Sequence, residues 1–318
     1  MKWKFYSLAF VAGMSILTAC SSDDNNDNDG NGGNGNGNEI ENGTILKGTI
    51  TSDVTLAAGN TYKLSGEYIV EEGATLHIEE GVKIIAVYDD IADYILVKQG
   101  GKINAVGTPD KPIVMTSEKE EPGAWGGIHI CGRAHTNAEG GKGSSEIGGA
   151  VYGGNDDADN SGTLQYIRLE YTGFAFDEEH EANGISFYGV GNGTIVDHCQ
   201  AYKGSDDGFE FFGGSVNVSN LVAVSCSDDS FDWTEGWNGK GTNLVAYQED
   251  KSTLGYDCDC LMECDNNGSN NAATPVAHPV LKNLILVGNG GSKQGIRLRA
   301  GTEVEIDNAK VCGKGQPL

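Results

Sequence analysis

The chain has 318 residues, including 48 glycines and 6 prolines, and its 46 acidic and 21 basic side chains give a formal charge of −25. This charge argues against binding nucleic acid or an anionic membrane surface through a basic patch, and leaves cations and neutral sugars as partners. Glycine without a G-X-Y period excludes collagen, and at this density it favours an all-β chain with many turns.

The first residues predict export. Lys2 and Lys4 precede an apolar run over residues 5–17, which is too short to span a membrane and is typical of a signal peptide. The letters LTAC, which end in Cys20, resemble the lipobox of bacterial lipoproteins. The resemblance implies that residues 1–19 are a lipoprotein signal peptide and that Cys20 carries a lipid. An ordinary secretory peptide cut elsewhere is the alternative.

Residues 20–42 predict an acidic, Asn/Gly-rich linker. From Ser21 to Asn38 the chain has no apolar residue, so we expect a disordered tether. The acidic stretch after the lipobox resembles the surface-export signal of Bacteroidetes lipoproteins, which implies a lipid anchor in the outer membrane and a domain facing the cell exterior. No later apolar stretch reaches the roughly 20 residues of a membrane span, so we expect no transmembrane segment.

Residues 43–318 contain an irregular repeat. SDDGFEF at 205–211 recurs 22 residues later as SDDSFDW, and VEEGATLHI at 70–78 recurs 27 residues later as VKQGGKINA. A period in the low twenties is typical of one coil of a parallel β-helix. A propeller blade is about twice as long, and a β-sandwich lacks such offsets. The length predicts an all-β, single-stranded parallel β-helix of roughly ten coils.

Strand periodicity assigns side chains to the two faces of each strand. The element Gly-apolar-x-apolar begins at Gly127, Gly184, Gly208 and Gly295. Because side chains alternate along a strand, its apolar residues point into the solenoid and x points outward. We therefore expect inward columns such as Phe209 over Phe231, with Trp233 inward as well.

Five sequence blocks resemble a known family. They are GTPDKPIVMTS at 107–117, PGAWGGIHICGRA at 122–134, DNSGTLQYIRLEYTG at 159–173, DDGFEFFGG and DDSFDW. They are similar to the right-handed, pectin-lyase-like β-helix lipoproteins of Bacteroidetes, a family without a settled biochemical activity, and the resemblance extends over nearly all of the chain after the linker. It implies a right-handed solenoid. Members tend to continue past this end, and CGKGQPL offers no polar cap, so a truncated C-terminus with an exposed edge is an open alternative.

The outward positions predict a column of charged side chains. They are His129, Ser186, Glu210, Asp232, Glu263 and Arg297, where Glu263 follows from an irregular offset of 31 residues. Carboxylates at coil spacing repel each other by roughly 0.8 kcal/mol per pair in water and about 3 at an effective dielectric of 20. A Ca²⁺ ion, which accepts irregular oxygen ligands, would offset this repulsion. The candidate ligands are Glu210, Asp232, Glu263, Asp206, Asp207, Asp228 and Asp229. A solvated acidic face screened by salt is the alternative.

Two functions are compatible with such a column. The leading interpretation is non-catalytic binding of a glycan or other surface ligand along the acidic face, with structural calcium. The alternative is a calcium-dependent polysaccharide lyase, because pectate-lyase-type β-helices combine stacked acids, Ca²⁺ and a basic residue. In that case Arg297 would be the base or substrate clamp, although few basic residues are available to hold a polyanion. Hydrolysis by a carboxylate pair is a weaker third hypothesis.

Three weaker signals complete the prediction. Asp157 and Asp159 resemble the start of a calcium loop, but Arg168 stands where the bidentate Glu belongs, and a turn is the alternative. Trp237, with Phe212 nearby, is a candidate for stacking on a sugar ring, whereas Trp125 is expected to be structural. The seven cysteines after Cys20 predict small apolar packing or one or two cross-rung disulfides, rather than a thiolate metal site at Cys258, Cys260 and Cys264.

Overall fold

A computed structural model describes residues 38–89, 91–176 and 180–318. The predicted signal peptide, Cys20 and most of the predicted linker lie outside the described residues. The first strand, β1 (Asn38–Glu39), already pairs with β3, so the first coil includes the last residues of the segment expected as linker. No helix in the described ranges is long and apolar enough to cross a membrane.

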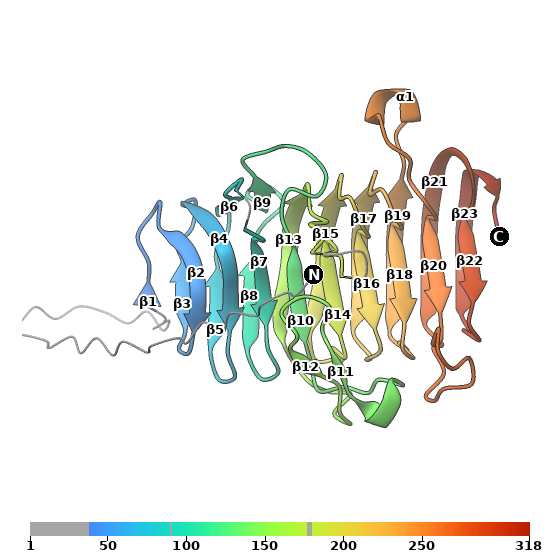
Figure 1. The fold of residues 1–318 in the computed structure, drawn as a ribbon, viewed down its shortest axis with the longest axis horizontal. Helices are drawn as coiled ribbons and strands as arrows, with labels where there is room; N and C mark the ends of the chain where they lie inside the picture. Colours follow the sequence, from blue (N-terminus) through green and yellow to red (C-terminus); the bar gives the residue numbers. More distant parts are fainter. Residues whose placement is uncertain (1–37, 90, 177–179) are drawn as a thin grey trace, which may run out of the picture. The chain divides into compact units, whose positions relative to one another are not determined.

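The strands stack in parallel as three faces of a solenoid, which Figure 1 shows side by side from blue to red. Face A consists of β1, β3 (Val54–Leu56), β5 (Thr75–Ile78), β8 (Lys102–Val106) and the first halves of β13 (Gly162–Glu170), β15 (Ile195–Tyr202), β17 (Asn217–Val224), β19 (Lys240–Tyr247), β21 (Val280–Gln294) and β23 (Glu305–Gln316). Face B consists of the first halves of β2 (Ile45–Ile50) and β4 (Thr61–Val70), then β6 (Lys83–Ala86), β9 (Ile113–Ser117) and the second halves of β13 to β23.

Face C carries the predicted outward column. It consists of the second halves of β2 and β4, then β7 (Tyr94–Val97), β10 (Ile128–Cys131), β14 (Ile185–Tyr188), β16 (Phe209–Phe212), β18 (Phe231–Thr234), β20 (Met262–Asp265) and β22 (Ile296–Arg299). The predicted all-β, right-handed parallel β-helix of roughly ten coils is therefore confirmed.

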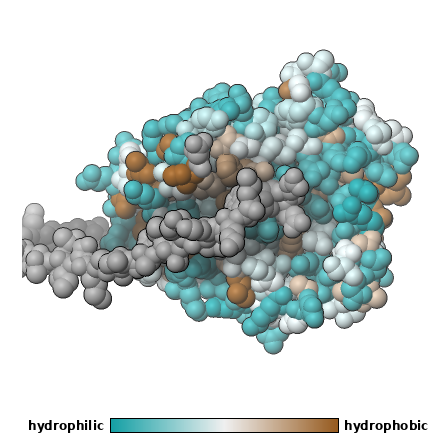
Figure 2. Space-filling view, viewed as in Figure 1, coloured by the Kyte–Doolittle hydropathy of each residue, from teal (hydrophilic) through white to brown (hydrophobic). Residues whose placement is uncertain are grey.

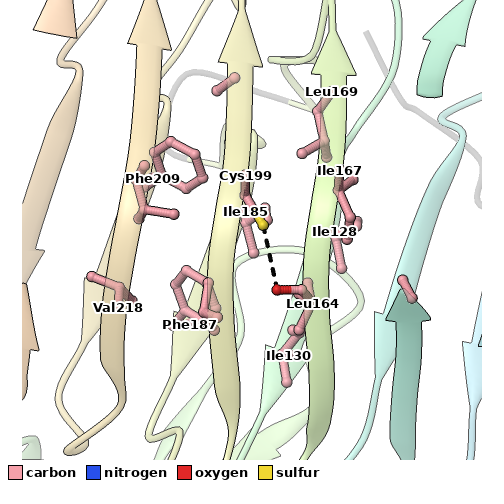
Figure 3. Close-up of a cluster of buried hydrophobic side chains, with 14 of the residues drawn as sticks. Ile128, Ile130, Leu164, Ile167, Leu169, Ile185, Phe187, Cys199, Phe209 and Val218 are labelled. Atoms are coloured by element: carbon pink, nitrogen blue, oxygen red, sulfur yellow. Dashed lines mark hydrogen bonds between the residues drawn. The ribbon is translucent and has the colours of Figure 1, made fainter. Parts of the chain in front are cut away.

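Apolar side chains stack between coils to form the core, as Figure 3 shows for Ile128, Ile185 and Phe209. Phe209 lies over Phe231 with ring centroids 5.6 Å apart, as the repeat predicts. Complete burial of one such side chain contributes roughly 1.5–3 kcal/mol, so the stability comes from the stack of coils rather than from any single coil.

The corner between faces A and B holds an asparagine ladder that sequence periodicity did not reveal. Asn220, Asn243, Asn283 and Asn308 all have left-handed backbones, with φ between 55° and 63°. From Asn243 onward, each amide nitrogen donates to the amide oxygen one coil before it, at 2.8, 3.0 and 2.8 Å. Asparagine tolerates this conformation better than other residues with a Cβ, so the ladder fixes the same turn in successive coils.

Two insertions cover part of the outer surface of face C. Residues 132–161 contain a 3₁₀ turn (Glu139–Gly141) and the hairpin β11 (Gly143–Ser144) and β12 (Val151–Tyr152), and the described residues 172–176 and 180–184 belong to the second insertion. Together with face C they enclose a second apolar cluster that includes Leu96, Cys131, Ile147, Tyr152, Ala182, Tyr188 and Phe212. His129 and Ser186 point outward from the solenoid and yet are fully buried by these insertions.

The remaining insertions lie nearer the C-terminus. One carries the short helix α1 (Lys251–Leu254), and another forms the loop 266–279 after β20. On the face viewed in Figure 2, most of the coloured surface is hydrophilic, and hydrophobic residues form small separate groups.

Candidate metal centre

The strand register confirms the predicted outward column. Ser186, Glu210, Asp232, Glu263 and Arg297 are successive partners across the face C strands, and His129 precedes them. The pairing of Asp232 with Glu263 also confirms the irregular offset, which arises because the α1 insertion lengthens that coil.

Carboxylates from three parts of the fold line one cavity of about 190 Å³. Face C contributes Glu210 and Asp232, and the turns before its strands contribute Asp206, Asp207 and Asp228. The two insertions add Glu146 and Glu181. We call this cavity the acidic pocket. Because every residue that lines the acidic pocket is acidic, the pocket has a larger formal negative charge than the outward column, which also contains Arg297.

The carboxylates form overlapping groups whose oxygens lie within 4.8 Å of one another. These groups are Asp206 with Asp207 and Asp228, Asp207 with Glu210 and Asp232, and Asp229 with Asp232 and Glu263. Asp207 belongs to two groups and Asp232 to two, so the groups are continuous along the solenoid axis. This spacing brings together the seven predicted ligands.

Burial and mutual repulsion raise the pKa values of these acids. Burial, followed by the charge of neighbouring carboxylates, raises the pKa of Asp206 to about 8 and that of Asp229 to about 8. Burial raises the pKa of Glu146 to about 7. The same causes raise the pKa values of Asp207, Glu210 and Asp232 well above their ordinary range. Without a compensating cation, several of these groups hold protons at neutral pH.

Hydrogen bonds hold three of the clustered carboxylates in place. The backbone amide of Asp229 donates to Asp207 Oδ1 at 2.8 Å, and the amide of Cys260 donates to Asp229 Oδ1 at 2.6 Å. Asn183 Nδ2 donates to Glu210 Oε2 at 2.5 Å. In contrast, Asp232 Oδ1 is shielded from solvent and has no hydrogen-bond partner among the described residues.

Arginines neutralise the C-terminal end of the column. Arg297 Nη1 contacts Glu263 Oε1 at 2.7 Å, and Arg299 pairs with Asp265 at 2.6 Å and also with Glu263. The guanidinium of Arg297, considered from the sequence as a base or substrate clamp, is thus already ion-paired. Arg299 and Asp265 were missed, although their position two residues after the column places them on the same side of the strand.

The acids of the insertions were also missed. Glu146 and Glu181 lie in segments without the coil repeat, so no register argument could align them with Glu210. Asn183, which contacts Glu210, lies in the same kind of segment. Only the folded chain brings them to face C.

The predicted calcium loop is a turn in the structure. Asp157 Oδ1 accepts hydrogen bonds from the backbone of His135 at 3.1 Å and lies 2.6 Å from its Nδ1. Asp159 Oδ2 accepts from the backbone amide of Arg133 at 3.1 Å. Neither aspartate belongs to a carboxylate group of metal-binding spacing in the part of the chain that the structure describes. The arrangement favours the alternative interpretation of a turn.

The prediction that Trp237 stacks on a sugar ring at the surface is wrong. Trp237 is only 1% exposed, its ring stacks on Phe211 at 4.2 Å, and its indole nitrogen donates to Val216 O at 3.2 Å. The chain reverses at Gly236 (φ 84°) and directs Trp237 into the core. Phe212 is also buried, stacked on Tyr188 at 4.4 Å.

Two other tryptophans confirm their predicted structural roles. Trp233 is in register with Phe211, points inward and is fully buried. Trp125 is buried, and its indole nitrogen donates to Glu170 O at 2.7 Å.

The seven described cysteines are free thiols, and all but Cys312 are buried. Burial raises the pKa of Cys258 to about 11 and that of Cys264 well above its ordinary value, so the thiolate is disfavoured. This pattern agrees with small apolar packing rather than with cross-rung disulfides among these residues.

A comparison with protein families identifies the fold independently. A family described as "Pectate-lyase like beta helix domain" matches residues 48–318. No curated protein matches the chain.

Proposed function

Because the chain belongs to the pectate-lyase-like β-helix family, we propose that it is a lipid-anchored cell-surface solenoid that binds a glycan or another surface ligand without cleaving it, and that its acidic pocket holds Ca²⁺. The lipid anchor would be Cys20 in the outer membrane, with the solenoid facing the cell exterior.

The observation that carries the cation proposal is the pocket around Asp232. One of its oxygens is shielded from water without a hydrogen-bond partner among the described residues, while oxygens of Asp207 and Glu210 lie within 4.8 Å. A buried carboxylate oxygen without a donor is costly, and a bound cation would supply the missing partner. The same ion would remove the repulsion between the stacked acids.

Ca²⁺ fits this pocket better than Mg²⁺. Ca²⁺ accepts six to eight oxygen ligands in irregular geometry, whereas Mg²⁺ requires a near-ideal octahedron and retains its waters. The pocket offers carboxylates from strands, turns and insertions, a large set of oxygen ligands that suits the higher coordination number of Ca²⁺. A calcium ion would cross-link adjacent coils and could also receive the hydroxyl oxygens of a ligand.

Binding without catalysis is favoured over a lyase reaction by the surroundings of Arg297. A lyase needs a base near the substrate carboxylate and cationic groups to hold a polyuronate. Arg297 is instead paired with Glu263, and the residues that line the acidic pocket are all carboxylic acids. An anionic substrate would be repelled there unless cations reversed the charge.

One set of experiments tests the function. The purified protein is incubated with polygalacturonate and Ca²⁺, and unsaturated product is followed by its ultraviolet absorbance. We expect no product. Product formation that disappears in Glu210→Gln but persists in the exposed control Asp110→Asn would instead establish the lyase alternative.

A second set tests location. We expect an alkyne fatty acid to label the wild-type protein but not Cys20→Ser in the native host, and external protease to degrade the solenoid on intact cells. Labelling of Cys20→Ser, or protection from protease until the cells are lysed, would contradict the surface anchor.

A further inference from the structure

A larger cavity lies at the opposite ends of the face C strands. Its volume is about 670 Å³, within the range of small-molecule sites, and it shares no lining residue with the acidic pocket. It lies between the insertion 132–161 and the loop 266–279. Its lining residues are Asn137, Ala138, Glu139, Thr234, Glu235, Asn267, Gly268, Ser269 and Asn270.

The composition of this polar cavity restricts its ligand. The residues that line it include two acids and no lysine, arginine, histidine or aromatic residue. An anionic ligand would find no counter-charge, and a flat apolar ligand would bury polar groups without partners. Amides and hydroxyls both donate and accept hydrogen bonds, as sugar hydroxyls do, and carboxylates accept from them. The lining therefore matches a neutral, hydroxyl-rich molecule.

Glu235 has an unusual backbone for its residue type. Because Tyr188, Phe212 and Thr234 are in register, the next residues in the three coils, Gly189, Gly213 and Glu235, are equivalent. All three are left-handed, with φ of 56°, 65° and 55°. Glycine adopts this conformation freely, whereas for a residue with a Cβ the left-handed backbone has a conformational cost of roughly 1–2 kcal/mol. The glutamate therefore occupies a corner where the two preceding coils use glycine.

The carboxylate of Glu235 is held in place by the insertion. Its Oε2 accepts hydrogen bonds from Thr136 Oγ1 at 2.7 Å and from Tyr152 Oη at 2.8 Å. Its backbone oxygen accepts from the amide of Asn137 at 2.9 Å. The carboxylate is thus an oriented acceptor at the cavity wall.

An amide network joins the two walls. Asn137 Nδ2 donates to Asn266 Oδ1 at 2.8 Å, and Asn267 Nδ2 donates to Asn137 Oδ1 at 3.0 Å. Asn137 and Asn266 are buried, so the network belongs to the folded structure and not to a solvated surface. A preformed polar site loses little conformational entropy on binding.

From these contacts we infer that the polar cavity is a saccharide site, separate from the acidic pocket, which binds a short neutral oligosaccharide with Glu235 as the oriented acceptor. Binding there does not require the cation of the proposed function. It provides the solenoid with a specific sugar contact at a place where the sequence indicated none.

Calorimetric titration of the full-length protein with cello-, xylo-, manno- and galacto-oligosaccharides tests this inference, with EDTA present. We expect one of these probes to bind. Glu235→Gln keeps the size of the side chain but removes its charge, and should weaken binding roughly tenfold, the effect of losing a charged hydrogen-bond acceptor. Ser269→Trp places a large ring from an exposed lining position into the cavity and should abolish binding.

Two controls separate this site from the acidic pocket and from misfolding. Ala272→Trp adds the same ring at an exposed position on the same loop but outside the lining, and should bind like wild type. Replacing EDTA by Ca²⁺ should leave the sugar affinity unchanged, because this cavity shares no lining residue with the acidic pocket. The inference is overturned if no probe binds, if binding persists in Ser269→Trp, or if binding requires Ca²⁺. Spermidine, a polyamine cation, tests whether the two acids of the lining select charge instead of hydroxyls. Binding of spermidine without binding of any sugar would also overturn the inference.

Discussion

Glu210 and Asp232 occupy the same outward position in adjacent coils, and an oxygen of each lies within 4.8 Å of the other and of an Asp207 oxygen. Parallel in-register stacking forces this proximity because neighbouring strands are about 4.8 Å apart. A repeat that places an acid at this position therefore creates an electrostatic cost in the folded state.

Calcium should stabilise the folded protein through Asp232. At a free Ca²⁺ concentration of 100 times Kd, binding adds about 2.7 kcal/mol to the free energy of unfolding, so we expect Tm to rise by roughly 5 °C relative to EDTA. Asp232→Asn should lose most of this shift, and Asp110→Asn, at an exposed position that does not line the acidic pocket, should keep it. Circular dichroism measures Tm. If Ca²⁺ raised Tm in Asp232→Asn as much as in Asp110→Asn, the ion would not bind through Asp232, and the acids would form only a solvated acidic face.

Without calcium, stability should fall as pH rises. The pKa values of Asp206 and Asp229 are raised to about 8, chiefly by burial, so the folded state holds protons that the unfolded chain releases near its ordinary pKa of about 3.9. Since the folded state binds more protons, the free energy of unfolding decreases from about pH 4 to about pH 8. Urea unfolding in EDTA at successive pH values measures this slope.

The same series has an internal check. Asp206→Asn cannot titrate, so its slope should be shallower and its cation-free stability above pH 7 higher than that of wild type. Saturating Ca²⁺ should also flatten or reverse the slope, because the ion binds the deprotonated acids. A slope that is unchanged in Asp206→Asn would contradict the assigned origin.

Trp237 should matter for stability and not as an exposed binding surface. Trp237→Ala removes a buried ring stacked on Phe211 and should cost about 3–5 kcal/mol, whereas Trp237→Phe should cost less. Tyr247→Ala, at a position 47% exposed, should change stability by less than about 0.5 kcal/mol. Urea unfolding checks this order. A stable Trp237→Ala that loses only ligand binding would restore the platform hypothesis.

The asparagine ladder should stabilise the corner between faces A and B. Asn243→Ala loses hydrogen bonds to Asn220 and from Asn283 and places alanine in a left-handed conformation, so we expect a loss of about 1–2 kcal/mol. Asn243→Gly also loses the hydrogen bonds, but glycine adopts the left-handed conformation without a cost. Its free energy of unfolding should therefore lie between those of wild type and Asn243→Ala. If glycine were as destabilising as alanine in denaturant unfolding, the backbone conformation would contribute nothing measurable.

The sequence by itself determined the solenoid and the outward column. A repeat of 20-odd residues and the alternation of apolar and outward side chains along each strand are enough to predict both features, because parallel stacking makes equivalent positions in successive coils spatial neighbours. Glu210, Asp232 and Glu263 could therefore be aligned from the order of residues alone. The same periodicity placed Phe209 over Phe231 and directed Trp233 inward.

Tertiary structure decided everything that depends on segments outside the repeat. Glu146 and Glu181 reach the acidic pocket from insertions, and Glu235 acquires its side-chain partners, Thr136 and Tyr152, from the insertion 132–161. Trp237 follows a left-handed glycine, so alternation could not predict which way it points. Periodicity fixes contacts between equivalent positions, whereas an insertion takes its position from packing and hydrogen bonds formed only once the coils are stacked.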